Sequence, residues 1–315
     1  MSPTVVPLGV HVLDVLVRPV EAIPEGQGGQ LVEQIRATAA GTAGGTALTL
    51  AKLGARTRSA GAIGADPLGD LLVELLRRSG VDTDLLLRRH DVQTSASVLP
   101  IRPNGERPAF HMVGANATYG AEDAPLDDIA AADALHLGGP EFMGGEAAAR
   151  VLAHAGANGT HTSADVLAGG DPGLLEWIAP ALPHVDVFLP NDEQVLGFTG
   201  ADSLEAGCRV LIERGAGMVA ATCGANGALL VEGGREAVRV PAFAVDVVDT
   251  TGCGDAFSAG FVVGVSLGRS PRDAAVLGCA AAALVAGGLG SDHGDFDLAA
   301  ADAFAQATPV RAAAV

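Results

Sequence analysis

The residues with the clearest capacity for chemistry lie between Asp249 and Asp255, in the stretch DTTGCGD. Gly252 and Gly254 flank Cys253 just before an Ala-rich segment that is typical of a helix. Glycines let successive backbone N–H groups point one way without interference from a Cβ atom. The start of a helix adds free N–H donors and the positive end of its dipole. The stretch therefore predicts an anion hole suited to a transferred phosphoryl group.

Asp255 lies in the first turn of this expected helix, where a carboxylate could take the proton of an acceptor hydroxyl as a general base. A simpler interpretation is a Gly-rich turn followed by an acidic residue that the helix dipole favours. Two common phosphate-binding motifs are excluded: the single lysine, Lys52, precedes Leu53 and not Ser or Thr, and no G-x-G-x-x-G occurs. Any phosphate site must use another arrangement.

The composition points to a globular protein with an acidic surface. Of the 315 residues, 49% are hydrophobic and 18% are charged, and the net charge is −18. Such a charge repels nucleic acid and anionic membranes, so neither is an expected partner. The four cysteines lack the close spacing of a zinc site or a disulfide framework, and no long apolar run is free of glycines and charges. We expect a cytoplasmic protein.

The first third of the sequence predicts two kinds of structure. Residues 5–17 read as one buried strand that ends near Asp14, and Asp66-Pro67 opens a helix that stops at Gly80. Two extended runs joined across Asn104-Gly105 form an expected hairpin. With the extended residues 28–40, this hairpin predicts a small sheet separate from the main one.

From residue 134 onward, strands and helices alternate. This is the rhythm of a mostly parallel sheet covered by helices, so the fold class is α/β. Residues 228–240 predict a hairpin. Helices are expected over 254–267, 272–286 and 297–306.

Several blocks, in chain order, resemble the PfkB family of ribokinase-like carbohydrate kinases. DTTGCGDAFSAGF is similar to the family's C-terminal signature almost throughout, with Cys253 where Ala or Gly is usual. The other similar blocks are VVPLGVHVLDVLV, AAGTAGGTALTLAKLGA, GAIGADPLGDLLVELLRRSGVDT, FLPNDEQVLGFTG, ATCGANGALL and CAAAALVAGGLGS. The resemblance implies a ribokinase-like three-layer αβα domain over residues 1–310, with a frayed end at 311–315. It also implies a small β-sheet lid inserted from about 15–40 and 92–114.

The resemblance also implies roles for single residues. Catalysis would be carried out by the base and its anion hole, which are Asp255, Gly252, Cys253 and Gly254. The expected acceptor-binding residues are Asp14, Gly41 and Gly45. Glu141 is added on its own position, because it follows the end of an expected strand and could reach the acceptor. The expected nucleotide-binding residues are Asn191, Thr222, Gly224, Gly227, Thr250 and Cys279. Mg²⁺, held through water, is assigned to Glu193 or Gln194, and a monovalent cation such as K⁺ to Asp249.

Structural interpretations of several of these residues stay open beside the functional ones. Asp14 could be a satisfied structural carboxylate, and Gly41 and Gly45 could be turn or helix-packing glycines. Asn191 could cap a helix, and residues 222–227 could form only a hairpin. The eight histidines include no pair with the spacing of metal ligands.

Besides Cys253, four positions depart from the family pattern. Ala40 and Gly45 stand where the first Gly of a pair and a sugar-binding Asn are usual. Gln194 replaces a Glu that orders Mg²⁺ through water, and Cys279 replaces an Asn or His beside the adenine. A ribose-type grip on the acceptor is therefore in question.

The expected function is ATP-dependent phosphorylation of a hydroxyl of a small neutral sugar or sugar-like acceptor. Residues 38–46 contain no cation, which favours a neutral acceptor over a sugar phosphate. Arg36, Arg102 or Arg107 on the lid could still supply charge, although Arg107 is expected to be solvated.

A nucleoside kinase of the adenosine, inosine or guanosine type is the alternative. Phe110 and Tyr119 are the only aromatic residues before position 120 that could stack on a base. A sugar-phosphate kinase and a non-catalytic binding protein are further alternatives. Because lids of this family often pair between subunits, we expect a homodimer.

Overall fold

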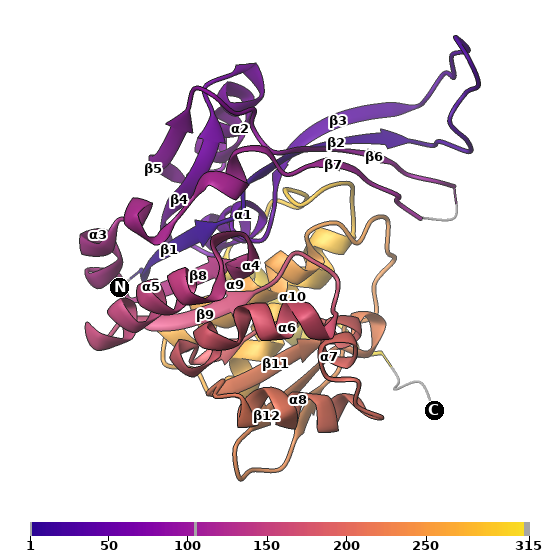
Figure 1. Cartoon of the computed structure of the whole chain (residues 1–315). Helices are drawn as coiled ribbons and strands as arrows, with labels where there is room; N and C mark the ends of the chain where they lie inside the picture. Colours follow the sequence, from indigo (N-terminus) through magenta and orange to yellow (C-terminus); the bar gives the residue numbers. More distant parts are fainter. Residues whose placement is uncertain (1, 104–105, 312–315) are drawn as a thin grey trace.

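The computed structural model describes residues 2–103 and 106–311. A nine-stranded sheet lies between two layers of helices, and four more strands form a separate lid sheet that extends to one side (Figure 1). The predicted three-layer αβα architecture with a lid is confirmed.

The main sheet has the strand order β13-β12-β11-β10-β9-β8-β1-β4-β5. Neighbouring strands are parallel from β11 to β5, whereas β12 and β13 are antiparallel, as the predicted hairpin requires. The strands are β1 (Thr4–Gly9), β4 (Arg56–Gly64), β5 (Asp82–Arg89), β8 (Ala134–Gly138), β9 (His161–Asp165), β10 (Val187–Phe188), β11 (Met218–Thr222), β12 (Ala228–Glu232) and β13 (Val238–Val240).

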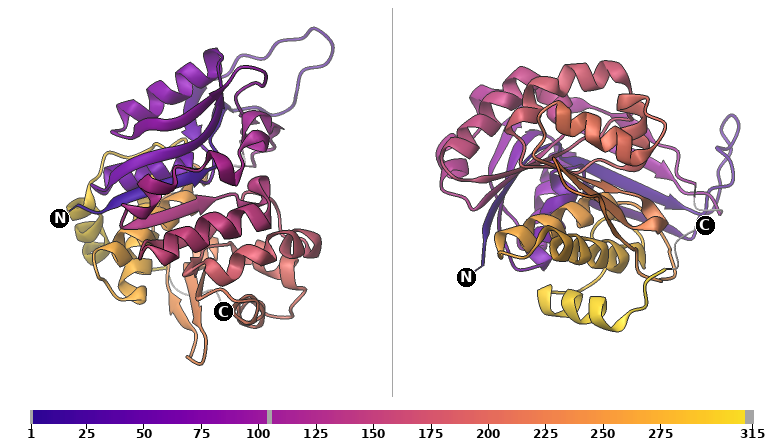
Figure 2. Two further views of the ribbon diagram at one scale, coloured as in Figure 1. Left: turned by 60° about the vertical axis from the view of Figure 1, so that its left-hand side comes forward. Right: turned by 90° about the horizontal axis from the view of Figure 1, so that it is seen from below.

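Helices cover both faces of this sheet, and Figure 2 shows the two layers in its right-hand view. One layer contains α1 (Gly44–Lys52), α2 (Pro67–Arg78), α9 (Cys253–Ser266), α10 (Pro271–Ala286) and α11 (Leu298–Ala307). The other contains α3 (Leu126–Ala130), α4 (Pro140–Met143), α5 (Gly145–Ala157), α6 (Pro172–Ile178), α7 (Asp192–Thr199) and α8 (Leu204–Glu213). Successive residues of β1 face opposite sides of the sheet. Val5 packs against the layer that contains α9, and Val6 packs against the layer that contains α5.

Small residues let the helices of the first layer approach closely. A Cβ atom on Gly260 of α9 would lie 2.7 Å from the Cα of Gly278 on α10. A low aromatic content suits such packing, because few bulky side chains must be accommodated. Within the described ranges, no helix combines the length and apolarity needed to cross a membrane.

The opening run of the chain is two strands and not the single strand predicted over 5–17. β1 ends at Gly9, and β2 (Val12–Arg18) belongs to the lid sheet. Gly9 has φ +123°, and a Cβ there would lie 2.0 Å from the carbonyl oxygen of Gly138. This close backbone approach, which the sequence does not reveal, turns the chain from one sheet into the other. Asp14 therefore lies in the middle of β2.

The lid sheet has the order β3-β2-β6-β7, formed by β2 with β3 (Gln34–Ala40), β6 (Ala96–Pro100) and β7 (Phe110–Met112). β6 and β7 are antiparallel, although the predicted turn at Asn104-Gly105 lies outside the described residues. Most of the expected frayed end, 312–315, also lies outside them. Arg311 is held, because its N–H donates to the carbonyl of Ala242.

Candidate active site

The site lies where the carboxyl ends of the parallel strands meet. The chain runs from β1 outward to β4 and β5 on one side, and from β8 to β11 on the other. Open α/β sheets bind ligands at such a reversal of strand order. β1 ends there at Gly9, β8 at Gly138 and β9 at Asp165.

The loop before α9 carries the residues of the predicted anion hole. Gly252 caps the helix with φ +76°, and a Cβ there would lie 2.6 Å from the side chain of Ser291, so only glycine fits. A Cβ on Gly254 would meet no atom within 4 Å, so its backbone borders open space. In the described part of the chain, the N–H groups of Gly254 and Asp255 have no acceptor. Both remain available to an anion.

Asp255 lies at the base of this site, surrounded by protein and reached by solvent only in part. Burial raises the pKa of its carboxyl well above the usual value, and the negative charges of Asp165 and Asp14 raise it further. The nearby guanidinium of Arg107 opposes this shift. A carboxyl with a raised pKa is a stronger base toward a hydroxyl proton.

Asp165, at the end of β9, was not singled out in the sequence. It is 6% exposed, and its Oδ1 lies 3.6 Å from Nε2 of the buried His136. Burial raises the pKa of Asp165, although His136 and a hydrogen bond from Ser258 oppose that shift. An acidic residue that ends a buried parallel strand is the signal that could have found it, since such strands end at the site.

Asp14 faces the main body from the lid. It pairs with Thr38 of β3 and Ser97 of β6, and Leu16 on the same face packs against Leu289. Burial raises the pKa of Asp14 to about 6, against the opposing effects of a hydrogen bond from Ser97 and the charge of Arg107. The structure therefore brings Asp14 and Asp255 into one electrostatic environment.

Gly45 lies directly against the base. A Cβ atom there would lie 2.1 Å from Oδ2 of Asp255, so Asp255 fills the space that a side chain at position 45 would need. In this chain the Asp255 carboxyl thus occupies the space where the family's Asn side chain would begin. Gly41 has φ +86°, and a Cβ on it would lie 2.6 Å from the carbonyl oxygen of Val10, which supports its interpretation as a turn glycine.

Glu141, expected near the acceptor, holds the loop that follows β9. Its Oε1 accepts hydrogen bonds from the N–H groups of Leu167 (2.7 Å) and Ala168 (3.0 Å). Its Oε2 is buried without a partner in the described ranges, and burial raises the pKa of the carboxyl. One oxygen of Glu141 thus supports the loop and the other is unused.

Four of the expected nucleotide residues lie at the end of β11, in the turn after it and at the start of α7. Asn191 caps α7, with Oδ1 accepting the N–H of Gln194 at 2.8 Å, and it also forms a bridge with Thr222 at the end of β11. Capping is therefore one of its tasks. Gly224 (φ +51°) and Gly227 (φ +85°) shape the turn into β12, as the hairpin interpretation requires.

Gln194 is committed to protein contacts. Its Oε1 accepts the N–H of Asn191, and its Nε2 donates to the carbonyls of Val166 and Ala168 at 3.0 Å each. A glutamate could not donate these two bonds. Glu193 is exposed on the first turn of α7.

The remaining expected residues line the loop before α9 and the helix beside it. The exposed Thr250 accepts the N–H of Cys253 through its carbonyl. Cys279 is buried in α10, and its thiol pKa is raised to about 12 by burial and then by the nearby Cys223. Burial also raises the pKa of the Cys253 thiol to about 12, which keeps it protonated near neutral pH.

Asp249 joins the loop before α9 to the segment after α10. Its Oδ1 accepts hydrogen bonds from the N–H and the hydroxyl of Thr251, and its Oδ2 accepts the N–H of Gly290 at 2.9 Å. The adjoining Ser291 hydroxyl is buried and has no partner within the described chain.

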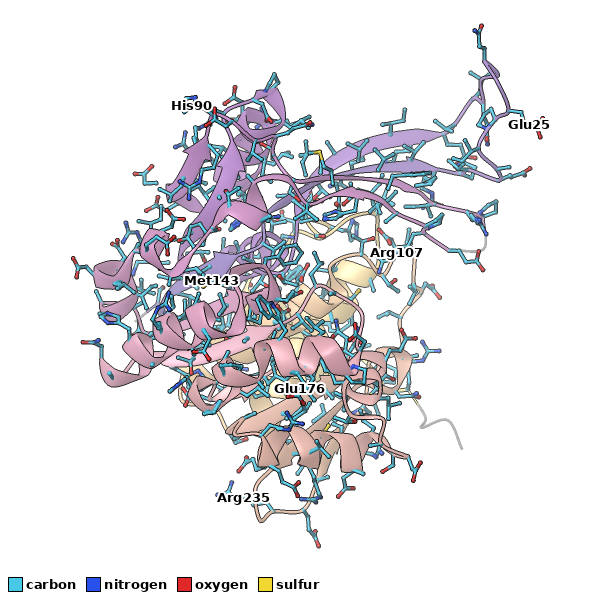
Figure 3. All side chains as sticks on the ribbon, viewed as in Figure 1. Glu25, His90, Arg107, Met143, Glu176 and Arg235 are labelled. Atoms are coloured by element: carbon cyan, nitrogen blue, oxygen red, sulfur yellow. The ribbon has the colours of Figure 1, made fainter. Side chains whose placement is uncertain are left out.

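Arg107, on the loop between β6 and β7, is exposed, as its interpretation as a solvated charge expects, but its side chain also contacts the loop before α9. Its Nη1 donates to the Thr251 hydroxyl at 2.7 Å, across 144 positions of sequence. Figure 3 places Arg107 between the lid strands and the C-terminal part of the chain. Sequence patterns offered no signal for this contact.

Comparison with known proteins decides the family. Residues 9–295 match the model of the pfkB family carbohydrate kinases. The chain belongs to this family. An uncharacterized sugar kinase of Archaeoglobus fulgidus is 28% identical over 240 residues, which cover 73% of this chain and 90% of that protein. The ATP-dependent ribose-1-phosphate kinase of Halopiger xanaduensis is 30% identical over 249 residues, which cover 79% of this chain and 80% of that protein.

Solved structures agree on the fold. The Arabidopsis thaliana ribokinase complexed with ribose and ATP superimposes with a TM-score of 0.83 at 23% identity, covering 97% of this chain and 99% of that one. The arrangement of sheet, helices and lid is therefore that of ribokinases.

In this pfkB family kinase, the contact between Gly45 and Asp255 predicts how one methyl group added at position 45 changes kcat. Gly45→Ala should push the Asp255 carboxyl aside and lower kcat by about 10²-fold, because a displacement of about 1 Å has effects of that size. Gly44→Ala is the matched control, since its Cβ would come no nearer than 3.3 Å to the His11 ring. Steady-state kinetics and urea unfolding of both variants check this. An unchanged kcat in Gly45→Ala would contradict the assigned position of the base.

The carboxylates predict the pH dependence of the kinase. Asp255 must be ionised to accept a proton, so kcat/KM should fall as the pH drops through its raised pKa. Asp165→Asn removes a neighbouring negative charge, so the pKa of Asp255 should fall and the acid limb should move to lower pH. The control is Asp202→Asn, which changes an exposed carboxyl. The pH profiles of kcat/KM for the wild type and both variants test this prediction. An acid limb that stays in place in Asp165→Asn, or moves to higher pH, contradicts the assignment of Asp255 as the base.

Proposed function

We propose that this pfkB family kinase transfers the terminal phosphoryl group of Mg-ATP to a hydroxyl of a small uncharged sugar or sugar-like acceptor. The observation that carries the proposal is Asp255 beside the free N–H groups at the start of α9, opposite Asp14 of the lid. Asp255 takes the hydroxyl proton, the N–H groups stabilise the charge on the phosphoryl group, and Asp14 binds acceptor hydroxyls. The lid limits the access of water, which would otherwise compete as acceptor.

Of Arg36, Arg102 and Arg107, the first two are paired with protein carboxylates, and Arg107 is anchored to Thr251 and interacts electrostatically with Asp14. This pairing favours an uncharged acceptor. Arg36 is engaged by the Asp292 carboxylate (2.8 Å) and the Leu289 carbonyl, and Arg102 is paired with Glu106. The Asp14 carboxylate itself would repel an acidic group. The Halopiger relative, a ribose-1-phosphate kinase, makes a sugar phosphate the second candidate, and a nucleoside remains a third.

Two cations fit the site. Mg²⁺ usually binds through substrate phosphates, waters and one or two carboxylates, and the exposed Glu193 suits this role better than the engaged Gln194. A monovalent cation such as K⁺ suits Asp249, because three neutral donors surround this buried carboxylate and the Ser291 hydroxyl beside it lacks a partner among the described residues. All four cysteines are free thiols, in keeping with the expected cytoplasmic location.

The lid also supports the expected homodimer. Strand register places Ile35, Val98, Phe110 and Met112 on the face opposite to Asp14. Their exposed fractions are 66%, 45%, 61% and 38%. An apolar sheet face of this kind marks an interaction surface, and a second copy of the lid is complementary to it.

A charged substitution on this apolar face of the lid tests the predicted homodimer. Val98→Glu should convert the dimer into a monomer, because a carboxylate would be buried without a partner in the interface. Light scattering after size exclusion measures the mass. Leu71→Glu, an exposed apolar position on α2, is the matched control and should leave the dimer intact. A monomeric wild type, or a Val98→Glu protein that stays dimeric, would overturn this interface.

The function is tested with a panel of free sugars, sugar acids, sugar phosphates and nucleosides, measuring ADP release in KCl and in LiCl. One acceptor class should give turnover, and Asp255→Asn should lower it by about 10²- to 10⁴-fold while ATP still binds. Asp246→Asn, an exposed carboxyl on the preceding loop, is the control. Equal rates in KCl and in LiCl would contradict a role for a monovalent cation at this site. ATP binding without turnover on any acceptor would favour a non-catalytic binding protein.

A further inference from the structure

The segment between α10 and α11, residues 287–297, borders the candidate site although it forms neither helix nor strand. The N–H of Gly290 donates to Oδ2 of Asp249 at 2.9 Å. Ser291 is buried directly against Gly252, since a Cβ atom on Gly252 would lie 2.6 Å from its side chain. The segment thus contacts both the beginning and the end of the loop before α9. The position of this loop therefore depends on the position of the segment.

Two cations hold the segment from the side away from this loop. Lys52, the last residue of α1, donates from Nζ to the carbonyls of Asp292 (2.8 Å) and His293 (2.7 Å). Arg36 of β3 donates to the Leu289 carbonyl (2.6 Å) and to the Asp292 carboxylate (2.8 Å). Over the described ranges, no backbone N–H donates to these three carbonyls. Because buried carbonyls need donors, the two cations supply what a helix or a sheet would otherwise provide.

Lys52 is enclosed by the groups that it contacts. Its Nζ lies 5.0 Å from the centre of the Phe296 ring, within the range of a cation–π interaction. Burial lowers the pKa of Lys52 to about 8, although the charge of Asp292 opposes this shift. Lys52 is also the only lysine among the 19 Lys and Arg residues of the chain. A compact ammonium can donate to two successive carbonyls from one atom, whereas a guanidinium is larger and spreads its donors over three nitrogens.

Lys52 lies away from the reacting groups. Gly45, which contacts Asp255, is near the start of α1, and Lys52 is at its end, about 10 Å further along the helix axis. Any effect of Lys52 on the reaction must therefore pass through the segment that it holds.

We propose that Lys52 is a positioning residue for phosphoryl transfer, acting through residues 287–293 on the loop that carries the anion hole. This inference rests on the proposed kinase function and adds a residue outside the site. With Lys52 in place, the segment stays fixed and Ser291 supports the backbone of Gly252. The free N–H groups at the start of α9 then keep their direction toward the transferred phosphoryl group. Lys52 itself touches neither nucleotide nor acceptor and keeps its protons.

Arg36 gives the same segment a second hold, from the lid. Leu289 also packs against Leu16, which lies on the face of the lid sheet that carries Asp14. Loss of Lys52 therefore leaves the segment attached at Leu289 and at the Asp292 carboxylate. For this reason we expect a displaced segment in a folded protein, and not the unfolding of the chain.

Hydrogen exchange tests the hold on the segment without nucleotide or acceptor. In Lys52→Met, the amides of residues 287–293 should exchange about 10-fold faster, since hydrogen bonds to charged groups have that strength. Arg269→Met is the matched control, because Arg269 also donates two hydrogen bonds, both to Asp302 of α11 at 2.7 Å. It should leave exchange in residues 287–293 unchanged. Unchanged exchange in Lys52→Met would overturn the inference.

Kinetics with the acceptor from the panel test the effect on transfer. Lys52→Met should lower kcat by about 10-fold, less than the 10²-fold of a 1 Å displacement because Arg36 still holds the segment. The KM for the acceptor should stay the same. Arg269→Met, compared by urea unfolding, shows what a similar loss of stability does by itself. A kcat in Lys52→Met that is no lower than in Arg269→Met, or a raised acceptor KM with unchanged kcat, would contradict a positioning role.

The conservative variant separates hydrogen bonding from packing. Lys52→Arg keeps the charge and donors for the carbonyls, so it should recover part of the lost kcat and part of the slow exchange. No recovery of either would assign the loss to altered packing on Phe296 and would overturn the proposal.

The two arms distinguish this inference from the proposed function. A wild type without turnover on any acceptor refutes the kinase function and with it the role of Lys52 in transfer, whatever the exchange shows. Turnover in the wild type together with unchanged exchange in Lys52→Met overturns the inference alone.

Discussion

The concentration of carboxylates at the start of α9 is the constraint on which the rest of the site depends. In the proposed function Asp255 takes a hydroxyl proton, and burial together with the charges of Asp165 and Asp14 raises its pKa. The same charges oppose an anionic phosphoryl group. The free N–H groups at the start of α9 and the guanidinium of Arg107 offset them. The site is thus a balance between a strong base and an anion hole.

Close backbone packing makes this balance possible. Gly45 lets α1 approach the carboxyl of Asp255, Gly252 lets the loop before α9 approach Ser291, and Gly260 lets α9 approach α10. A side chain at any of these positions would force the groups that it meets to shift. At Gly45 the departure from the family pattern coincides with the close approach of the Asp255 carboxyl.

The two faces of the lid sheet carry different kinds of side chain. The face toward the main body carries Asp14, and the loop between β6 and β7 carries Arg107, so the lid places an acid and a cation near the start of α9. The opposite face carries Ile35, Val98 and Phe110, which suit a second lid. A dimer through this face would hold the strands that deliver Asp14 and Arg107.

The sequence by itself determined those features of the fold and the site that depend only on residues close together in the chain. The βα rhythm, the cap at Asp66, the hairpin after Thr222 and the contiguous stretch that ends at Asp255 are local, because propensities, caps and glycine turns act over a few positions. Only the tertiary structure decided where distant segments meet. It split residues 5–17 at the contact of Gly9 with Gly138, placed Gly45 against Asp255, and brought Arg107 to Thr251. Such contacts depend on how whole layers pack, and no local pattern encodes that packing.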